Sequence, residues 1–211
     1  MLRIADIRNG PESAAATRRR GDAARRPRLG ATLNQMPRPS LAAVLGGGDR
    51  RSIGRSNEVA ALVLAHRERF SELIACLWSD DPLVRMRAAD AAEKASAQYP
   101  ALLEPFKAEL LGLLVEADQQ ELLWHLAQII PRLSLSAGER QRAAGIFRSL
   151  LKHRGSLVKT AGLQALADLS RHDAGLRSEV MERIEAALRT GTPAMKARAR
   201  NLLKDFQGGL R

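Results

Sequence analysis

The side chains that most often carry covalent or metal chemistry are few and isolated in this sequence. Cys76 is the single cysteine of 211 residues, so an intrachain disulfide and an all-cysteine metal site are excluded. No two of the four histidines lie three or four residues apart, the spacing that places two metal ligands together on a helix. Phosphate-cradling and dinucleotide-binding glycine motifs do not occur. We therefore predict no catalytic residue, no metal site and no cofactor.

A different set of side chains could bind another macromolecule through non-covalent contacts. On a helix that advances about 100° per residue from Leu122, Trp124 and Gln128 lie at about 200° and 240°, away from the expected core. Tryptophan and arginine are enriched at protein–protein interfaces. The alternative is that Trp124 packs against a neighbouring helix. The candidate partner-binding residues are Met86, Arg87, Asp90, Trp124, His125, Gln128, Thr160, Gln164, Arg198 and Asn201.

An internal repeat brings these residues into register. Val84, Leu122, Val158 and Met195 are spaced by 38, 36 and 37 residues, a period typical of helical repeats. Cys76 falls in a column of otherwise apolar residues and is expected to be a small core side chain. The columns expected in the core lie eleven residues before each anchor (Leu73, Leu111, Phe147, Ile184), seven before (Leu77, Val115, Leu151, Leu188) and eight after (Ala92, Ile130, Leu166, Leu203).

Each repeat is predicted to form a helix, a short turn and a second helix. Leu122, Leu126 and Ile129 have helical spacing. Asp81 before Pro82 is typical of a helix start, and two pairs, Asp118 with Glu121 and Ser136 with Glu139, have capping-box spacing. The predicted units are residues 69–100, 101–136, 137–173 and 174–207, preceded by one leading helix at 57–66.

The stretch DDPLVRMRAADAAEKA (80–95) resembles the turn and second helix of a HEAT repeat, with an Asp-Pro turn, a Val-Arg pair and paired small residues. The stretches at 155–169 and 191–206 are similar, with lysine in the arginine place, whereas the second unit departs from the pattern at Leu123. This resemblance implies an all-α, right-handed α-solenoid whose second helices line a concave face. We expect the basic residue, as at Arg85, to pair with an acid of the turn, such as Asp80 or Asp81; the alternative is contact with nucleic acid.

Residues 1–55 hold twelve arginines, no lysine and four acids. Their Arg, Gly and Pro content predicts a largely disordered tail, with Gly46–Gly48 as a flexible linker. Three interpretations stay open: an arm that binds nucleic acid, an organelle-targeting segment, and a misassigned translation start, with the real chain beginning at Met36.

The predicted function is that of a cytoplasmic, non-enzymatic scaffold that binds a protein partner along the concave face. The sequence contains no run of 18 apolar residues, so we predict no membrane-spanning segment. Residues 56–136 have a net charge of −5 and residues 137–211 a net charge of +8, which favours oriented docking. The main alternative is nucleic-acid binding through the tail and the basic C-terminal half, and a lesser one is a HEAT-like DNA glycosylase using Asp90 and Trp124. The oligomeric state is left open.

Overall fold

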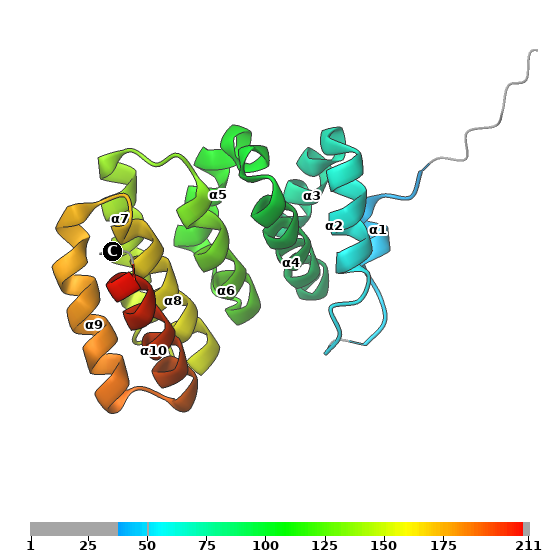
Figure 1. Cartoon of the computed structure of the whole chain (residues 1–211). Coiled ribbons are helices and arrows are strands. Elements are labelled where there is room, and N and C mark those ends of the chain that lie inside the picture. Colours follow the sequence, from blue (N-terminus) through cyan, green and yellow to red (C-terminus); the bar gives the residue numbers. More distant parts are fainter. Residues whose placement is uncertain (1–37, 50, 209–211) are drawn as a thin grey trace, which may run out of the picture. The chain divides into compact units, whose positions relative to one another are not determined.

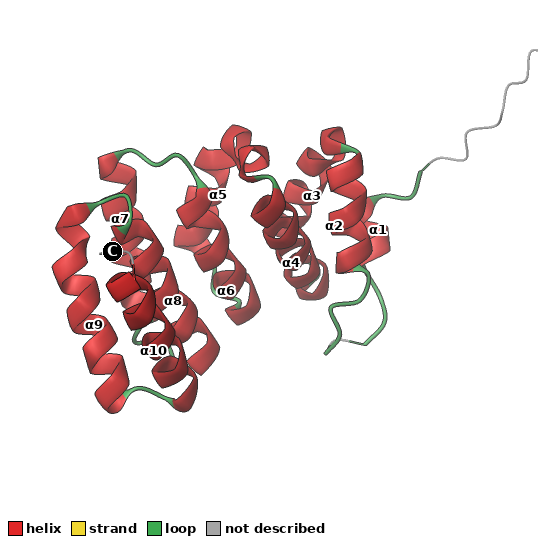
Figure 2. Cartoon of the chain, in the orientation of Figure 1, coloured by secondary structure: helices red, strands yellow, loops and turns green. Residues whose placement is uncertain are grey.

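Every regular element in the part of the chain that the structure describes is a helix (Figure 2), which confirms the all-α prediction. The computed structural model describes residues 38–49 and 51–208. The predicted tail therefore lies mostly outside the described residues. The α-helices are α1 (Leu41–Leu45), α2 (Ser56–Ala65), α3 (Phe70–Ala75), α4 (Pro82–Gln98), α5 (Lys107–Glu116), α6 (Gln120–Ile129), α7 (Ala137–Leu150), α8 (Ser156–Ser170), α9 (Arg177–Thr190) and α10 (Pro193–Gly208).

Polar residues at the helix starts set several boundaries. The Asp81 carboxylate accepts a hydrogen bond from the Leu83 amide at 2.8 Å, with Pro82 in the first turn of α4. Ser136 and Glu139 form the predicted capping box of α7. The predicted box of Asp118 and Glu121 is wrong, because α6 begins after Gln119, which makes no side-chain cap. The Gln119 side chain instead donates to the Pro82 carbonyl of α4 at 2.9 Å, so contact with the neighbouring helix fixes this start.

The even-numbered helices pack side by side in the order α2, α4, α6, α8 and α10, which we call the helix row (Figure 1). Of the other helices, α3 packs on α4, α7 on α8 and α9 on α10, while α5 contacts α6 and α7. Each helix of the row therefore has one face toward its neighbours in the row and another toward the odd-numbered helices. The candidate partner-binding residues all belong to α4, α6, α8 and α10.

Arg85 connects two members of the helix row. Its guanidinium donates to the Ser79 carbonyl at 2.7 Å, to the Asp80 carbonyl at 3.3 Å and to the Gln119 side-chain oxygen at 3.0 Å. The prediction of an ion pair between Arg85 and a carboxylate of the turn is wrong. The Asp81 carboxylate caps α4, and the Ser79 and Asp80 carbonyls accept the hydrogen bonds from Arg85 instead. The role is nonetheless structural, since these bonds join the turn before α4 to the start of α6.

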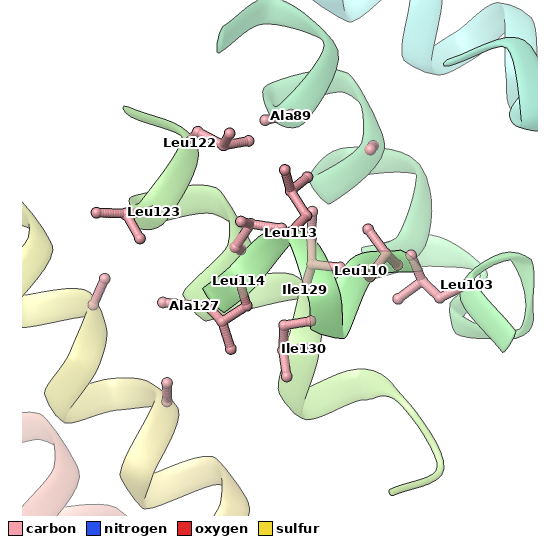
Figure 3. Close-up of a cluster of buried hydrophobic side chains, with 14 of the residues drawn as sticks. Ala89, Leu103, Leu110, Leu113, Leu114, Leu122, Leu123, Ala127, Ile129 and Ile130 are labelled. Carbon is pink, nitrogen blue, oxygen red and sulfur yellow. The ribbon is translucent and has the colours of Figure 1, made fainter. Parts of the chain in front are cut away.

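Leucine, isoleucine and alanine side chains fill the space between the two helix layers. Around α5 and α6, the buried side chains converge from α4, the segment Pro100–Phe106, α5 and α6 (Figure 3). Three of the four anchors, Val84, Leu122 and Val158, are buried, and Met195 of the last helix is half-buried. Cys76 is buried, as expected from its column, and burial raises the pKa of its thiol.

One predicted core column is displaced by a residue. Leu77 is buried, but Val115 is 71% exposed, and Leu151 and Leu188 are only half-buried. The preceding column is buried throughout, because a step of one residue turns the side chain by about 100° around the helix. Those buried residues are Cys76, Leu114, Leu150 and Ala187.

The predicted tail boundary at residue 55 is wrong. Leu41 and Leu45 of α1 are fully buried, and the Leu41 amide donates to the Glu72 carboxylate of α3 at 2.7 Å. The expectation of a flexible linker at Gly46–Gly48 is wrong too, because Gly47 and Gly48 adopt positive φ values of 71° and 76° in a turn whose Gly47 carbonyl binds Arg87. The short apolar stretch LAAVL was too brief to show a helical period, yet it supplies two core side chains.

Candidate recognition surface

The ten candidate residues differ widely in exposure. Arg87, Asp90 and His125 are only 2%, 8% and 3% exposed, so the expectation that they face solvent is wrong. Arg198 and Asn201 on α10 are exposed. The remaining five lie half-buried along the helix row: Met86, Trp124, Gln128, Thr160 and Gln164.

Arg87 is buried because the chain before α2 wraps around its guanidinium. The three nitrogens donate to four backbone carbonyls, those of Leu45 at 2.8 Å, Gly47 at 2.5 Å, Asp49 at 2.8 Å and Ser52 at 3.1 Å. No carboxylate of the described residues takes part in this set of bonds. A guanidinium has five N–H donors in a fixed plane, and here they hold the segment before α2 in place.

The approach of this segment to Arg87 requires glycine at one position. Gly54 has a φ of 53°, and a Cβ added there would lie 2.6 Å from the Arg87 Cζ. Both the left-handed backbone and the lack of a side chain are therefore needed. Arg87 is consequently committed to folding and is not available to a partner.

Asp90 lies at the centre of a second buried set of contacts, which join α2, α4 and α6. Its carboxylate accepts hydrogen bonds from the Ser56 hydroxyl and from Lys94, and Lys94 also reaches Asn57 at 2.6 Å. The His125 Nε2 lies 3.9 Å from the other carboxylate oxygen. These five residues form what we call the Asp90 cluster.

The chemistry of the Asp90 cluster does not match nucleophilic catalysis. Ser56 donates to Asp90, whereas a serine nucleophile would donate to the imidazole. Burial lowers the pKa of His125, and its Nδ1 has no hydrogen-bond partner among the described residues. The Trp124 ring stacks on His125 with 4.4 Å between ring centres. Because Asp90 is already engaged by this chain, it is not presented to a ligand.

Farther along the helix row, Gln164 links two helices. Its side-chain oxygen accepts from Arg198 of α10 at 3.1 Å, and its nitrogen donates to Asp168 at 2.9 Å. Burial raises the pKa of Asp168, although the hydrogen bond from Gln164 and the charge of Arg198 act to lower it. Of the candidate glutamines, Gln164 thus joins α8 to α10, whereas Gln128 bonds to the Trp124 carbonyl of its own helix at 3.3 Å.

A hollow of about 960 Å³ opens beside the ends of α6 and α8, and we call it the α6–α8 hollow. Gln128 and Gln164 line it, so two of the predicted residues meet there. The sequence interpretation missed its other lining residues, most of which lie in the turn after α6 and at the end of α8, outside the repeat columns, while Pro100, Lys107 and Arg140 come from the segment before α5, from α5 and from α7. Among the described residues that line it, the basic ones are Lys107, Arg132, Arg140, Arg171 and His172, and the one acid is Asp168.

The cations of the α6–α8 hollow differ in how fully this chain engages them. Arg132 binds the Glu93 carboxylate and carbonyl and the Ser96 hydroxyl. Lys107 lies 3.4 Å from the Glu139 carboxylate. Arg140 donates to the Leu135 carbonyl, and its Nε has no partner among the described residues. Arg171 lies 3.7 Å from Asp168, and 55% of its side chain is exposed.

The described residues contain no group of three or more side chains that could together hold a metal ion. Within the same ranges, none of the helices is long and apolar enough to cross a membrane. Comparison with protein-family models, with curated proteins and with solved structures finds no match to this chain. The resemblance to HEAT repeats is therefore not supported by a family match.

Proposed function

We propose that this chain is a right-handed, HEAT-like α-solenoid that binds a protein partner along a concave face formed by the helix row. The order of packing, α2 to α4 to α6 to α8 to α10, supports this proposal, as does the pairing of α4, α8 and α10 with the helix that precedes each. In such repeat proteins, each unit contacts only its neighbours and the stacked helices offer an extended binding surface.

The observation that carries the proposal is that Trp124 and Gln128, which lines the α6–α8 hollow, lie one turn apart on α6. Gln128 bonds to the Trp124 carbonyl and also lines the hollow, so a half-buried aromatic ring and a large recess belong to the same helix. Interface hot spots combine a tryptophan or arginine with surroundings that exclude water. A partner that covers α6 would bury both features together.

A non-enzymatic role fits the chemistry of the helix row better than a glycosylase or a hydrolase. Asp90 would have to be free to act on a ligand, but it is 8% exposed and accepts bonds from Ser56 and Lys94. Gln128 and Gln164, which line the hollow, and the exposed Asn201 are amides, which form hydrogen bonds and do not titrate.

Substitution of Trp124 tests the proposal. Trp124→Ala should weaken binding to a partner purified from native, nuclease-treated lysate by about 2 kcal/mol, roughly 30-fold in Kd, because a hot-spot ring is lost. Since Trp124 stacks on His125, circular dichroism and urea unfolding must show that the variant is folded. Trp78→Ala is a matched control, because Trp78 is 45% exposed and lies beside α3, off the helix row.

A partner that binds Trp124→Ala as tightly as the wild type, while Trp78→Ala weakens the complex, would move the interface away from the helix row. Equal effects from both variants would also contradict a local site at Trp124. Calorimetric titration with the purified partner gives these affinities directly.

Nucleic-acid binding is a second candidate, and the charge of α10 favours it. Arg198, Arg200 and Lys204 are exposed on this helix, and residues 137–211 have a net charge of +8. Contacts between such residues and phosphates would make log K fall by about 0.9 for each contact as log salt rises. Tight binding to DNA or RNA in 0.2 M salt that Trp124→Ala leaves unchanged would favour this candidate over the protein scaffold.

A further inference from the structure

We propose that the α6–α8 hollow receives an acidic segment of the protein partner, with one or more carboxylates bound by Arg140 and Arg171 and an apolar side chain between them. This inference rests on the proposed function, because it names the chemistry of the partner at one place on the helix row. It does not depend on Trp124, which is not among the lining residues.

The charge of the lining residues is the first argument. Four of them, Lys107, Arg132, Arg140 and Arg171, are permanently or normally cationic, and Asp168 is the one carboxylate among them. A recess lined largely by one sign of charge concentrates groups of the opposite sign. Since burial raises the pKa of Asp168, its carboxylate is protonated more easily than that of an exposed aspartate.

The unused hydrogen-bond donors are the second argument. Arg140 donates to one carbonyl, that of Leu135, and its Nε is buried without a partner among the described residues. Arg171 lies too far from Asp168, at 3.7 Å, for a normal hydrogen bond. A buried polar group without a partner costs free energy, and a carboxylate offers an arginine two parallel bonds. A ligand carboxylate would thus supply an acceptor to the exposed Arg171 side chain and to the Nη groups of Arg140, while the buried Arg140 Nε stays out of its reach.

The apolar part of the lining favours a peptide over the phosphate backbone of a nucleic acid. Pro131, Leu133, Leu135 and Leu169 line the recess beside the cations. No phenylalanine, tyrosine or tryptophan lines it, whereas proteins that bind single strands stack bases on aromatic rings. A volume of about 960 Å³ is near the upper end of the usual range for ligand pockets, and it can accommodate a few side chains of an extended peptide.

The experiment is a titration of the ¹⁵N-labelled full chain with the capped peptide acetyl-Asp-Leu-Glu-Leu-amide, followed by NMR of the arginine Nε–H groups and the backbone amides. The expected result is a saturable shift at Arg140, Arg171 and the turn after α6. The peptide acetyl-Lys-Leu-Lys-Leu-amide should cause no such shift. The double variant with Arg140→Gln and Arg171→Gln should weaken binding at least about tenfold, which corresponds to about 1.4 kcal/mol.

Two further variants keep the result interpretable. Arg171→Glu changes an exposed side chain, so it should fold normally and still abolish the shift, even where Arg140→Gln disturbs the turn through the lost bond to Leu135. Arg142→Gln is the matched control, because Arg142 is exposed on the same helix as Arg140 and does not line the hollow. Arg142→Gln and Trp124→Ala should both retain the peptide shift.

Four outcomes would overturn the inference. The first two are no shift at the hollow up to saturating peptide, and shifts that persist in Arg171→Glu. The third is that inorganic phosphate or a DNA hexamer shifts the same residues at equal concentration. The fourth is shifts that grow with protein concentration alone, which would indicate a second copy of this chain. The proposed function fails separately, if Trp124→Ala leaves the purified partner bound.

Discussion

Two regions around the helix row contain similar charged side chains. The described residues bind these side chains in one region and leave some of their donors unbonded in the other. Around α2, α4 and α6, the cations and the acid of the row, Arg87, Lys94 and Asp90, are bound by this chain. Around α6 and α8, Arg140 and Arg171 line a hollow with donors that the described residues leave unused. The difference is the segment from α1 to the start of α2, which covers the first region; the described residues provide no such cover at the second.

A charged stripe on a repeat helix therefore does not define a binding site by itself. Arg87 and Arg198 occupy equivalent places in their units, yet Arg87 is buried and Arg198 is exposed. The same column therefore stabilises the fold in one unit and offers a contact in another. We therefore propose that a partner binds the part of the row that the described residues leave uncovered.

The largest expected effect is a difference in the free energy of unfolding between variants of the two regions. Arg87→Met should lower the free energy of unfolding by about 4 kcal/mol, because several charge-assisted bonds of about 1.5–3 kcal/mol each are lost and the segment before α2 is released. Arg140→Met should cost about 1 kcal/mol, since one carbonyl loses its donor. Urea unfolding measures both, with the exposed Arg142→Met as control, expected within about 0.5 kcal/mol of the wild type. Equal losses at Arg87 and Arg140 would contradict the distinction between the regions.

The sequence predicts the fold class well because its evidence is local. Apolar spacing such as Leu122, Leu126 and Ile129, together with caps at Asp81 and Ser136, determines helices without knowledge of distant contacts. The burial of Arg87 could not be predicted in this way, because its four acceptors lie 35 to 42 residues earlier, in a segment without apolar periodicity.

The α6–α8 hollow escaped prediction for a different reason. Repeat columns locate residues by their angle on a helix, whereas Leu133, Ser134 and Leu135 belong to the turn after α6. Gln128 and Gln164 were identified as candidates because they lie on the helices themselves. The positions of Arg140 and Arg171 relative to one another depend on how α7 and α8 pack, which no sequence spacing shows.

A neighbouring pair of residues tests the corrected core register. Leu114→Ala should cost about 3 kcal/mol, because a fully buried leucine leaves a cavity. Val115→Ala should change the free energy of unfolding by less than about 0.5 kcal/mol, because Val115 is 71% exposed. Chemical denaturation monitored by circular dichroism measures both values. A larger loss for Val115 than for Leu114 would restore the column first predicted from the repeats.

The smallest expected effect concerns pH and is confined to the Asp90 cluster. Burial lowers the pKa of His125 in the folded chain, so the unfolded chain, with an ordinary histidine pKa of about 6.5, binds the proton first. This contribution to stability is therefore present above about pH 6.5 and is lost as the pH falls below it. His125→Phe, which keeps a ring against Trp124, should lose less stability than the wild type between about pH 7 and 5.

The difference between the two unfolding curves isolates His125 from the other histidines and from the carboxylates, which both chains share. Parallel loss of stability in His125→Phe and the wild type would show that His125 keeps an ordinary pKa. A steeper loss in the variant would reverse the sign and place a charged imidazole beside Asp90 in the folded chain.

We propose that the helix row binds a protein, and hydrogen–deuterium exchange of the full chain with and without its purified partner tests this proposal most directly. Binding should slow exchange in residues 120–136 and 156–172, which contain α6, α8 and the turn that lines the hollow, and at the start of α7 near Arg140. The rest of α7 and α9 should be unchanged. Slowed exchange confined to α3, α5, α7 and α9, or a complex that disappears on nuclease treatment, would contradict it.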